Sequence, residues 1–492
     1  EISCSLVGSE MCIRDRNYSY DDKYLFEFML RSDASAKFAP QNYWGMFPSW
    51  SAGWVISDEK WFDKDKTKID FLKIRGSFGI LGKDNVNAWL WTQLYTRNPD
   101  KGPIFGTNSS TNTSATIRMP KQGVNPDVHW DKTYKTNFGI DMAFLKNRMS
   151  ANLDFYYDMG REMFASHQGT SYYPNTVGIQ PAPENFGEVD TYGVELSLGW
   201  KDKIGKDMSY WVKLTTGYND NKIRETGWKA AYDFDKLVRN ERSDRGLWGY
   251  ECIGMFRSYQ EINEYFDKYS ITKYLGNTKE NVHPGMLIYK DVRGQYDEST
   301  GTFGPADGIV DEQDYIKISH RASNPYGGTL NFGFSYKDFS ISAQFGASWG
   351  AYSLVPTTMR KESYSEYSNV SAMWKDMFVY EDIYDANNIV TVAQNRNAKY
   401  PNIRYSSVNG APSTFWKVSA ATVQLRNMTV AYALPKEWLK IIGISSCRFN
   451  LTCQNVFNFL NPYPEGAWAS WAGSYGYYPN LRKFTLGVNV SF

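Results

Sequence analysis

The chain has 492 residues, of which 42% are hydrophobic and 16% aromatic, and its formal net charge is +1. No run of 18 apolar residues occurs, so the sequence predicts no transmembrane helix. The balanced charge argues against a nucleic-acid partner, and the presence of only four His argues against a His-rich metal site. The many Tyr and Trp residues suit membrane–water interfaces and sugar-binding surfaces.

The first 16 residues fit no predicted element. Residues 1–16 lack the long apolar stretch of a signal peptide, and residues 6–16 resemble translated sequencing adapter. We therefore expect 1–16 to be non-native sequence and the natural start of the protein to be missing. Residues 17–492 are expected to form one domain.

From residue 17 onward, many segments alternate strictly between apolar and polar residues, which predicts β-strands with one apolar face. Their length suits a strand that crosses a bilayer at a tilt, roughly 9–11 residues. The clearest examples are 72–80, 136–144, 149–157, 192–200, 330–336, 339–345 and 447–454.

The last nine residues show the same pattern most clearly. Phe484, Leu486, Val488, Val490 and Phe492 share one face, with Thr485, Gly487, Asn489 and Ser491 on the other. A strand with lipid on one side and a polar lumen on the other needs this arrangement. Bacterial outer-membrane barrels characteristically end this way, and Phe492 resembles the signal that the barrel assembly machinery reads.

The connections between the predicted strands alternate in length. Short turns are expected at 21–23, 146–148, 201–206 and 337–338, and a short helix at 435–444, whereas long loops are expected at 82–131, 159–187, 220–246, 351–414 and 458–480. Short turns at one end and long loops at the other are typical of bacterial barrels, with the long loops extracellular.

About fourteen complete strands are predicted, with a partial strand ending near Tyr20. The alternation of direction requires one further strand within 258–326, for which 286–290 and 315–319 are both candidates. The fold class is therefore all-β, an antiparallel transmembrane β-barrel.

Several blocks, in this order, resemble the SusC/RagA-like family of TonB-dependent outer-membrane transporters of Bacteroidetes. They are residues 17–27, 31–38, 44–54, 72–79, 425–432, 454–457 and 479–487. The resemblance implies a 22-stranded barrel with an N-terminal plug, of which this chain would supply about the last fourteen strands without the plug.

The same resemblance implies partners and a function. A SusD-like surface lipoprotein would cap the barrel, and the TonB complex would act through the missing N-terminal part. The pair would import oligosaccharides or, in some branches, peptides, from within outer-membrane lipid.

An acidic segment at 307–314 resembles half of a calcium loop. Asp307, the Ile309 carbonyl, Asp311 and Asp314 supply oxygen ligands at suitable spacing, and Asp291 supplies a further one. Residues 294–306 interrupt the compact motif, and the alternative is a tight acidic turn. Calcium is the only cofactor that the sequence suggests.

Two predicted long loops are rich in aromatic residues that could stack on sugar rings or pack against a partner. The first loop contains Trp89, Trp91 and Tyr95, and the second contains Trp468, Trp471, Tyr475, Tyr477 and Tyr478. Loop packing or docking of the partner lipoprotein explains them as well as direct contact with a ligand does.

Other side chains are assigned by the face that they occupy. Trp54, Trp200 and Tyr157 suit an interfacial aromatic girdle. Cys447 and Cys453 share one face of one strand, too far apart for a disulfide, and are interpreted as small lipid-facing residues. The residues expected to face the lumen are Asp141, Asp154, Glu195, Arg426, Arg448 and Gln454.

No enzyme motif is found: the sequence contains no Gly-x-Ser-x-Gly, His-Glu-x-x-His or phosphate-binding glycine loop. The main alternative to a transporter is a secreted or surface β-rich carbohydrate-binding protein or glycosidase, and a passive porin is a third reading. A soluble sandwich would bury its apolar face, whereas a barrel exposes it.

Overall fold

The computed structural model describes residues 9–98, 116–118, 123–165, 182–227, 239–297, 299–361, 371–441, 443–460, 463–464 and 481–492. Contacts divide the chain into two compact units. The first unit holds β1–β4, β7, β8 and most of β9, and the second holds β19, β20, β25–β27 and the loops between them.

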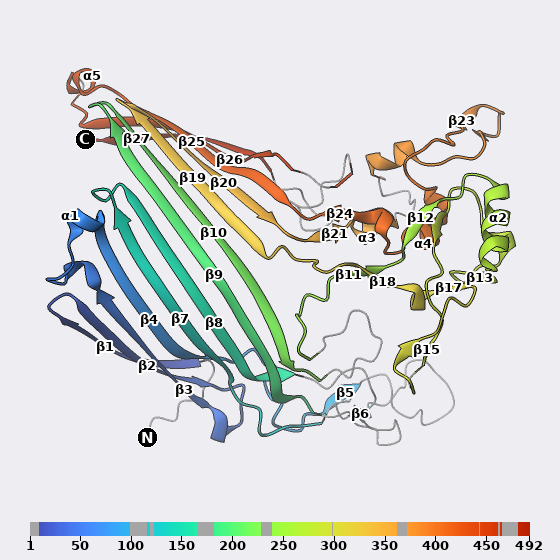
Figure 1. Cartoon of the computed structure of the whole chain (residues 1–492), viewed down its shortest axis with the longest axis horizontal. Coiled ribbons are helices and arrows are strands. Elements are labelled where there is room, and N and C mark those ends of the chain that lie inside the picture. The colour runs from blue at the N-terminus through green and yellow to red at the C-terminus, as the bar shows by residue number, and fades with distance from the viewer. Residues whose placement is uncertain are drawn as a thin grey trace. The chain divides into compact units, whose positions relative to one another are not determined.

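Thirteen strands form one sheet in which the strand order is the chain order (Figure 1). Neighbouring strands pair antiparallel from β1 to β9 and again from β19 to β27. The strands are β1 (Ser9–Tyr20), β2 (Tyr24–Ser35), β3 (Trp44–Val55), β4 (Ile69–Lys83), β7 (Asp131–Phe144), β8 (Met149–Ala165), β9 (Glu184–Ile204), β10 (Met208–Glu225), β19 (Tyr326–Tyr336), β20 (Phe339–Trp349), β25 (Thr422–Ala433), β26 (Ser446–Asn458) and β27 (Lys483–Ser491).

Each strand predicted from alternation is present, and the predicted short turns join them. Tight reversal requires left-handed backbone, which Asp21 and Asp22 adopt between β1 and β2 with φ of 53° each. Lys337 adopts φ of 52° between β19 and β20. We call the end of the strands that carries these connections the short-turn end, and the opposite end the long-loop end.

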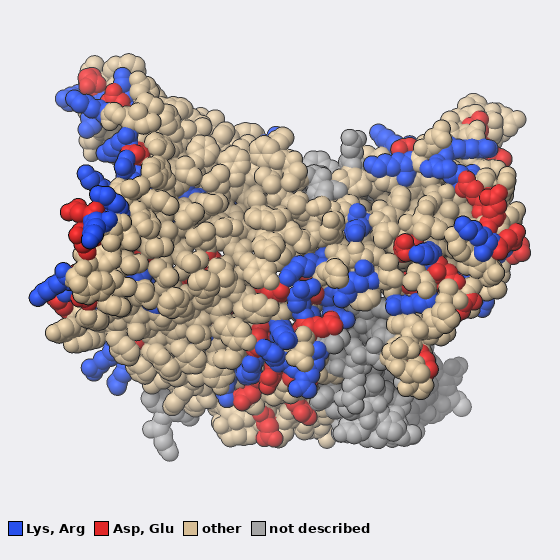
Figure 2. Space-filling view, in the orientation of Figure 1, with Lys and Arg blue, Asp and Glu red and all other residues tan. Residues whose placement is uncertain are grey.

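The apolar face of the sheet is exposed in both units. In the second unit, Leu486 is 74% exposed, Val488 51% and Leu451 42%. In the first unit, Phe26 and Phe138 are exposed as well. Figure 2 shows a broad surface almost free of charged side chains over the strands. The expected exposure of this face is confirmed, and it contradicts a soluble sandwich with a buried apolar face.

A separate hydrophobic core lies in the second unit, within the long loops 244–325 and 350–421. It is built from buried aromatic and aliphatic residues such as Tyr274, Tyr289, Phe378 and Trp416. Its elements are short: α2 (Tyr259–Tyr269), α3 (Thr357–Arg360), α4 (Ser406–Asn409), β11 (Leu247–Gly249), β12 (Cys252–Met255), β13 (Lys273–Tyr274), β14 (Leu287–Tyr289), β15 (Tyr296–Asp297), β16 (Thr302–Phe303), β17 (Ile309–Val310), β18 (Ile316–Ser319), β21 (Tyr352–Leu354), β22 (Ile383–Tyr384), β23 (Val390–Val392) and β24 (Lys417–Ser419). We call this region the loop subdomain.

The expected extra strand within 258–326 is wrong, and the described residues place thirteen strands in the sheet, against the expected number of about fourteen. Both candidate runs form short strands elsewhere: β14 pairs with β12, and β18 pairs with β11. Leu287 and Tyr289 are fully buried in the core of the loop subdomain, so this run has no face free for lipid. The described residues between β10 and β19, 239–297 and 299–325, add no strand to the thirteen-stranded sheet.

Strand β1 starts at Ser9, before the segment that we expected to begin the domain. Its pairing with β2 places Arg16 opposite Phe28 and Arg14 opposite Leu30. These arginines therefore share a face with apolar residues, where a charge near the bilayer midplane costs about 2–4 kcal/mol. The non-native origin of 1–16 stays a prediction.

Cys12, Cys252, Cys447 and Cys453 are all free, as expected for the last two. Cys447 and Cys453 are 8% and 4% exposed, so they are covered rather than open to lipid. Their cross-strand partners on β27 are Val490 and Phe484, which have bulkier side chains. Among the described residues, no helix is long and apolar enough to span a membrane.

Candidate functional site

The polar face of the first unit carries a connected network of charged and amide side chains. Arg75 on β4 donates to Asp154 at 2.7 Å, to Asp141 at 3.1 Å and to Asn137 at 3.2 Å. Asn152 donates to the same Asp141 at 2.8 Å. The carboxylates of Asp141 and Asp154 thus share one guanidinium. Each negative charge has a positive partner, although the two carboxylates lie close together on this face.

The network depends on Gly139. This residue belongs to β7 and lies in the path of the Arg75 side chain toward Asp154. A Cβ at this position would lie 2.5 Å from Arg75 Cζ. Only a residue without a side chain leaves space for the guanidinium to cross β7 and reach Asp154 on β8.

A cavity of about 570 Å³ opens beside this network on the polar face of the first unit. Lys135 forms an ion pair with Asp158 at 3.0 Å within it. Carboxylates, hydroxyls and one ammonium group offer hydrogen bonds to a polar ligand or to another protein segment. Its lining includes Glu27, Ser51, Lys135, Tyr156, Asp158 and Glu195.

The remaining predicted lumen residues lie on β25 and β26 in the second unit. Arg448 donates to Ser340 at 2.9 Å. Arg426 lies at a bulge between β25 and β26, and its guanidinium covers Gly346, because a Cβ there would lie 2.3 Å from Arg426 Nε. Gln454 pairs in register with Lys483 and Asn427.

Asp190 is the centre of a second cluster, which sequence reasoning missed. It is 1% exposed, and its Oδ2 accepts hydrogen bonds from Tyr157 at 2.7 Å and Arg224 at 2.5 Å, while its Oδ1 forms an ion pair with Arg161 at 2.7 Å. Tyr157, which we assigned to the girdle, therefore also ties β8 to β9. In the sequence, this cluster is marked only by an acidic residue two positions before the predicted strand 192–200 and by arginines near the ends of the adjacent strands.

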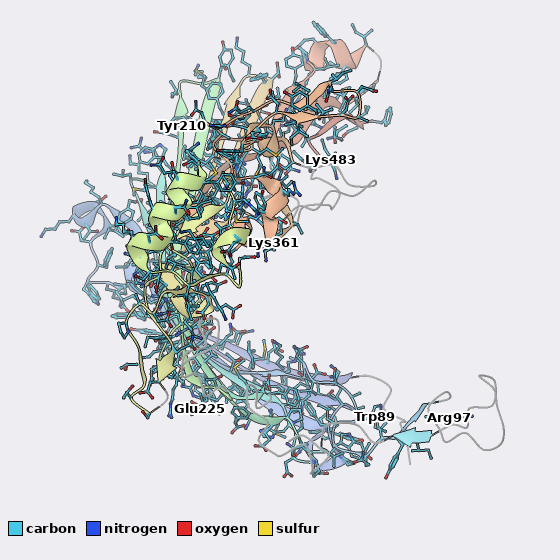
Figure 3. All side chains as sticks on the ribbon, turned by 90° about the vertical axis from the view of Figure 1, so that its right-hand side faces the viewer. Trp89, Arg97, Tyr210, Glu225, Lys361 and Lys483 are labelled. Carbon is cyan, nitrogen blue, oxygen red and sulfur yellow. The ribbon has the colours of Figure 1, made fainter. Side chains whose placement is uncertain are left out.

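The first aromatic loop is only partly folded against the protein. Trp89 and Trp91 have ring centroids 5.9 Å apart. Trp89 is 53% and Tyr95 62% exposed, so both offer open ring surface. Figure 3 shows Trp89 near the hairpin of β5 (Thr96–Asn98) and β6 (Thr116–Arg118). Trp468, Trp471, Tyr475, Tyr477 and Tyr478 lie outside the described residues.

The acidic segment lies in the loop subdomain, where Asp314 forms a tight turn with its neighbours. Asp314 is fully buried, and its carboxylate accepts the backbone N–H groups of Val292 at 2.7 Å, Arg293 at 3.1 Å and Asp311 at 3.0 Å. Both of its oxygens are occupied by backbone donors, as in the tight-turn alternative.

The other predicted ligand carboxylates also accept hydrogen bonds, and both oxygens of Asp311 are engaged, Oδ2 by the Gln295 side chain at 3.3 Å. Asp291 accepts Gly308 N–H at 2.7 Å through one oxygen, while its Oδ1 is buried without a hydrogen-bond partner. Asp307 accepts Ile309 N–H at 3.0 Å, and Asp311 accepts Gln313 N–H at 2.8 Å. Among the described residues, no three acidic, His or Cys side chains converge closely enough to hold a metal ion.

The electrostatics of this segment show uncompensated negative charge. Burial, reinforced by the charges of Asp307 and Asp311, raises the pKa of Asp291. Burial also raises the pKa of Asp314. A bound cation would oppose both effects, because it favours the charged form of each carboxylate.

Phe492 follows the last strand residue, Ser491, and is 91% exposed. Its ring therefore stays accessible at the short-turn end of β27. Within the interfacial girdle, Trp54 stacks on Tyr24 at 6.4 Å, and the guanidinium of Arg148 lies 5.9 Å from the Trp200 ring.

Comparisons with known proteins identify relatives along nearly the whole chain, although no family model matches. TonB-dependent receptor P39 of Formosa agariphila is 24% identical over 96% of this chain and 45% of its own length. TonB-dependent receptor SusC of Bacteroides thetaiotaomicron is 26% identical over 97% of this chain and 43% of its own length.

Solved structures give the same fold. The RagAB peptide importer in its closed-closed state matches 98% of this chain and 48% of that chain, with a TM-score of 0.67 and 18% sequence identity. The chain thus spans a little under half of the length of the relatives that it matches. Strand order, the exposed apolar face and the relatives agree: the chain is similar over nearly its whole length to TonB-dependent receptors, SusC among them, has the strand fold of the RagAB importer, and lies in the outer membrane.

Proposed function

We propose that the protein containing this chain imports a nutrient across the outer membrane. One observation carries the proposal: the sheet exposes a continuous apolar face, while its opposite face is polar and internally hydrogen-bonded. Lipid on one side and a hydrated passage on the other need this division. The relatives are receptors and transporters, which favours transport over a glycosidase.

The proposed substrate is an oligosaccharide, with a peptide as the alternative. One relative is named SusC, and one structural neighbour is titled a peptide importer, so the family name does not separate the two. Trp89 and Tyr95 offer flat exposed rings at the long-loop end, where a sugar or a peptide would arrive. A SusD-like lipoprotein is the proposed partner at the same end, with TonB acting through sequence outside this chain.

The test is uptake by the parent bacterium with and without the gene. Fluorescent oligosaccharides and peptides of equal size are offered, with and without an uncoupler of the proton-motive force. We expect uptake of one class to require both the gene and the energised membrane. Gene-dependent uptake that survives uncoupling would indicate a passive porin instead, and unchanged uptake of every probe would contradict the proposal.

We also propose that the acidic segment takes Ca²⁺. The buried, unpartnered Oδ1 of Asp291 and the raised pKa values of Asp291 and Asp314 support this. Ligand convergence would require Asp307 and Asp311 to move toward Asp291. Isothermal titration of the chain with Ca²⁺ tests the proposal, with Asp291→Asn as the variant that should lose binding.

A further inference from the structure

The loop subdomain carries four aromatic side chains that meet on its surface, each supplied by a different segment. Tyr259 begins α2, His283 lies before β14, Tyr380 lies before β22, and Tyr405 ends the short 3-10 helix Ile403–Tyr405. We call these four residues the aromatic row. All of them belong to the second unit.

The rings of the aromatic row contact one another in turn. The His283 ring stacks on the Tyr405 ring, with centroids 5.3 Å apart and an interplanar angle of 27°. The Tyr259 ring meets the His283 ring at 6.4 Å and the Tyr380 ring at 5.5 Å, both in edge-to-face geometry. Aromatic pairs favour these arrangements, so the rings hold one another in place with little loss of side-chain entropy.

Two members of the row are fixed by the core, and two stand outside it. Tyr380 and Tyr405 are half-buried and pack against the hydrophobic core of the loop subdomain. Arg396 covers the Tyr380 ring, with its Cζ 4.3 Å from the centroid, and its Nε donates to the Tyr380 carbonyl at 3.0 Å. Tyr259 and His283 lie outside the described residues that form or cover this core, and Tyr259 is 51% exposed. The fold therefore positions the Tyr259 ring without burying it.

The aromatic row also presents hydrogen-bonding groups toward solvent. Within the described part of the chain, the hydroxyls of Tyr259, Tyr380 and Tyr405 and the ring nitrogens of His283 have no hydrogen-bond partner. Burial raises the pKa of Tyr405, so its phenol stays protonated and able to donate. The row thus combines flat apolar surface with donors and acceptors at the ring edges.

This combination favours a sugar as the ligand. A sugar ring in its chair form has C–H groups on its faces and hydroxyls around its edge, which suit aromatic faces and phenol or imidazole groups respectively. Charge favours neither an anionic nor a cationic ligand, because the segments 257–261, 280–283, 380–385 and 396–405 carry four basic and five acidic residues. These are Arg257, Arg396, Lys399 and Arg404, and Glu261, Glu280, Glu381, Asp382 and Asp385.

We propose that the aromatic row binds a neutral oligosaccharide, whose sugar rings lie against Tyr259 and against the His283–Tyr405 pair. The inference deepens the proposed import function, on which its choice of ligand class rests. A peptide and the SusD-like lipoprotein are the other occupants that the experiment has to separate from a sugar.

The experiment measures binding to the full-length parent protein purified in detergent. Fluorescence anisotropy of labelled neutral hexasaccharides of glucose, xylose and mannose gives a Kd for each, and labelled uncharged hexapeptides are the second class of probe. Tyr259→Ala removes the exposed ring without opening the core. It should raise the Kd of the bound hexasaccharide roughly two- to ten-fold, the range expected for one lost aromatic contact. Tyr259→Phe keeps the ring and should change the Kd less.

The matched control is Tyr384→Ala. Tyr384 is 54% exposed on β22 of the same subdomain and lies outside the aromatic row, so its removal should leave the Kd unchanged. The amount of SusD-like lipoprotein that co-purifies with each variant is measured in the same preparations. It should be equal in all of them, because the row is assigned to a sugar and not to the partner.

The proposal is supported if Tyr259→Ala weakens hexasaccharide binding, Tyr384→Ala does not, and both variants retain the lipoprotein. It is overturned if the wild-type protein binds none of the hexasaccharides or binds the hexapeptides more tightly. It is also overturned if Tyr259→Ala binds as the wild type does, or if that variant loses the lipoprotein. Uptake by cells that does not depend on the gene, together with intact binding to the purified protein, would contradict the import function and leave the sugar site supported.

Discussion

On the polar face, the hydrogen-bond network of Arg75 requires that residue 139 has no Cβ atom. At Gly139 an added Cβ would meet the Arg75 guanidinium at 2.5 Å, although Arg75 holds both Asp141 and Asp154. The guanidinium must then withdraw, which leaves the carboxylates of Asp141 and Asp154 without their shared counter-charge. Glycine here is a requirement of the neighbouring side chain and not of the backbone turn.

We expect Gly139→Ala to destabilise the folded protein by about 1–3 kcal/mol, the usual range for an overpacked site. Gly76→Ala is the matched control on β4, because its Cβ would meet nothing closer than 3.9 Å. Thermal unfolding followed by gel mobility in detergent compares the two. Equal midpoints for both variants would show that Arg75 relocates at no cost.

The two faces of β27 give a second prediction at this scale. Val488 is 51% exposed on the apolar face, and Asn489 stands opposite Arg448 on the other. Val488→Arg should impair membrane assembly, since a charge near the bilayer midplane costs about 2–4 kcal/mol. Asn489→Arg should be milder. The amount of heat-modifiable protein in outer-membrane fractions measures this, and equal defects would mean that the faces are misassigned.

At the scale of elements, tyrosine hydroxyls hold the loop subdomain together. Tyr274 donates to the Leu287 carbonyl at 2.5 Å and accepts Tyr289 N–H at 2.9 Å. Burial raises the pKa of Tyr274 well above its ordinary value, so the hydroxyl stays protonated and able to donate. The hydroxyl thereby links β13 to β14, which share no backbone pairing.

Tyr274→Phe should therefore destabilise the loop subdomain by about 1–3 kcal/mol, because it leaves a buried carbonyl and a buried N–H unpaired. Tyr269→Phe is the matched control, since Tyr269 is 43% exposed at the end of α2. Hydrogen exchange of residues 287–289 provides the measurement. Similar exchange rates in both variants would show that water replaces the lost hydroxyl.

The acidic segment predicts an unusual dependence of stability on pH. The raised pKa values of Asp291 and Asp314 mean that the folded state binds protons more tightly than the unfolded state. Stability of the loop subdomain should then fall as pH rises from about 4 through these raised values. Added Ca²⁺ should reduce that fall by neutralising the carboxylates.

Near-ultraviolet circular dichroism of the tyrosine-rich core can follow this unfolding between pH 4 and 7, with and without Ca²⁺. Asp291→Asn should weaken both the pH dependence and the effect of Ca²⁺, whereas Glu312→Gln, which changes an exposed acid of the same segment, should leave both unchanged. Identical curves for the two variants would contradict the assignment.

Sequence pattern predicted the sheet because its strands repeat one local rule. Alternation at 447–454 and 484–492 follows from lipid on one face and water on the other, and no distant contact is needed to see it. The loop subdomain follows no such rule. Tyr274 lies more than 100 residues before Phe378 and Trp416 in the chain, yet all three meet in one core, so neither period nor spacing marks them.

The same limit explains the error in strand number and the missed cluster at Asp190. The 286–290 run has the composition of a strand, but burial of Leu287 and Tyr289 on all sides places it in the loop core. Arg161 and Arg224 are ordinary charged residues near strand ends and Asp190 lies within β9, and only the register of β8 and β9 brings Asp190 and Arg161 together. Local sequence patterns thus predict which face of a strand a residue occupies, whereas strand register and loop packing decide which residues it contacts.

At the scale of the whole molecule, strand pairing and coverage bear on what this chain can do alone. In the thirteen-stranded sheet, β1 and β27 are the outermost strands, each with one neighbour. The chain matches 43–45% of the length of the two relatives compared above. Unpaired backbone groups at a sheet edge cannot be satisfied by hydrocarbon, and barrels avoid this cost by closing.

We therefore expect a host that expresses this 492-residue chain alone to show no energy-dependent uptake, whereas the full-length parent supports it. The reason is physical: an open sheet leaves two rows of N–H and C=O groups without partners in lipid, and no segment of the described chain fills the polar face to gate it. Labelled oligosaccharides and peptides, offered with and without an uncoupler, measure the difference between the two hosts. Membrane fractions from both must first contain equal amounts of folded protein, so that poor expression is not mistaken for inactivity. Uncoupler-sensitive uptake by the short chain would refute the expectation and would mean that β1 and β27 pair to close a smaller working barrel.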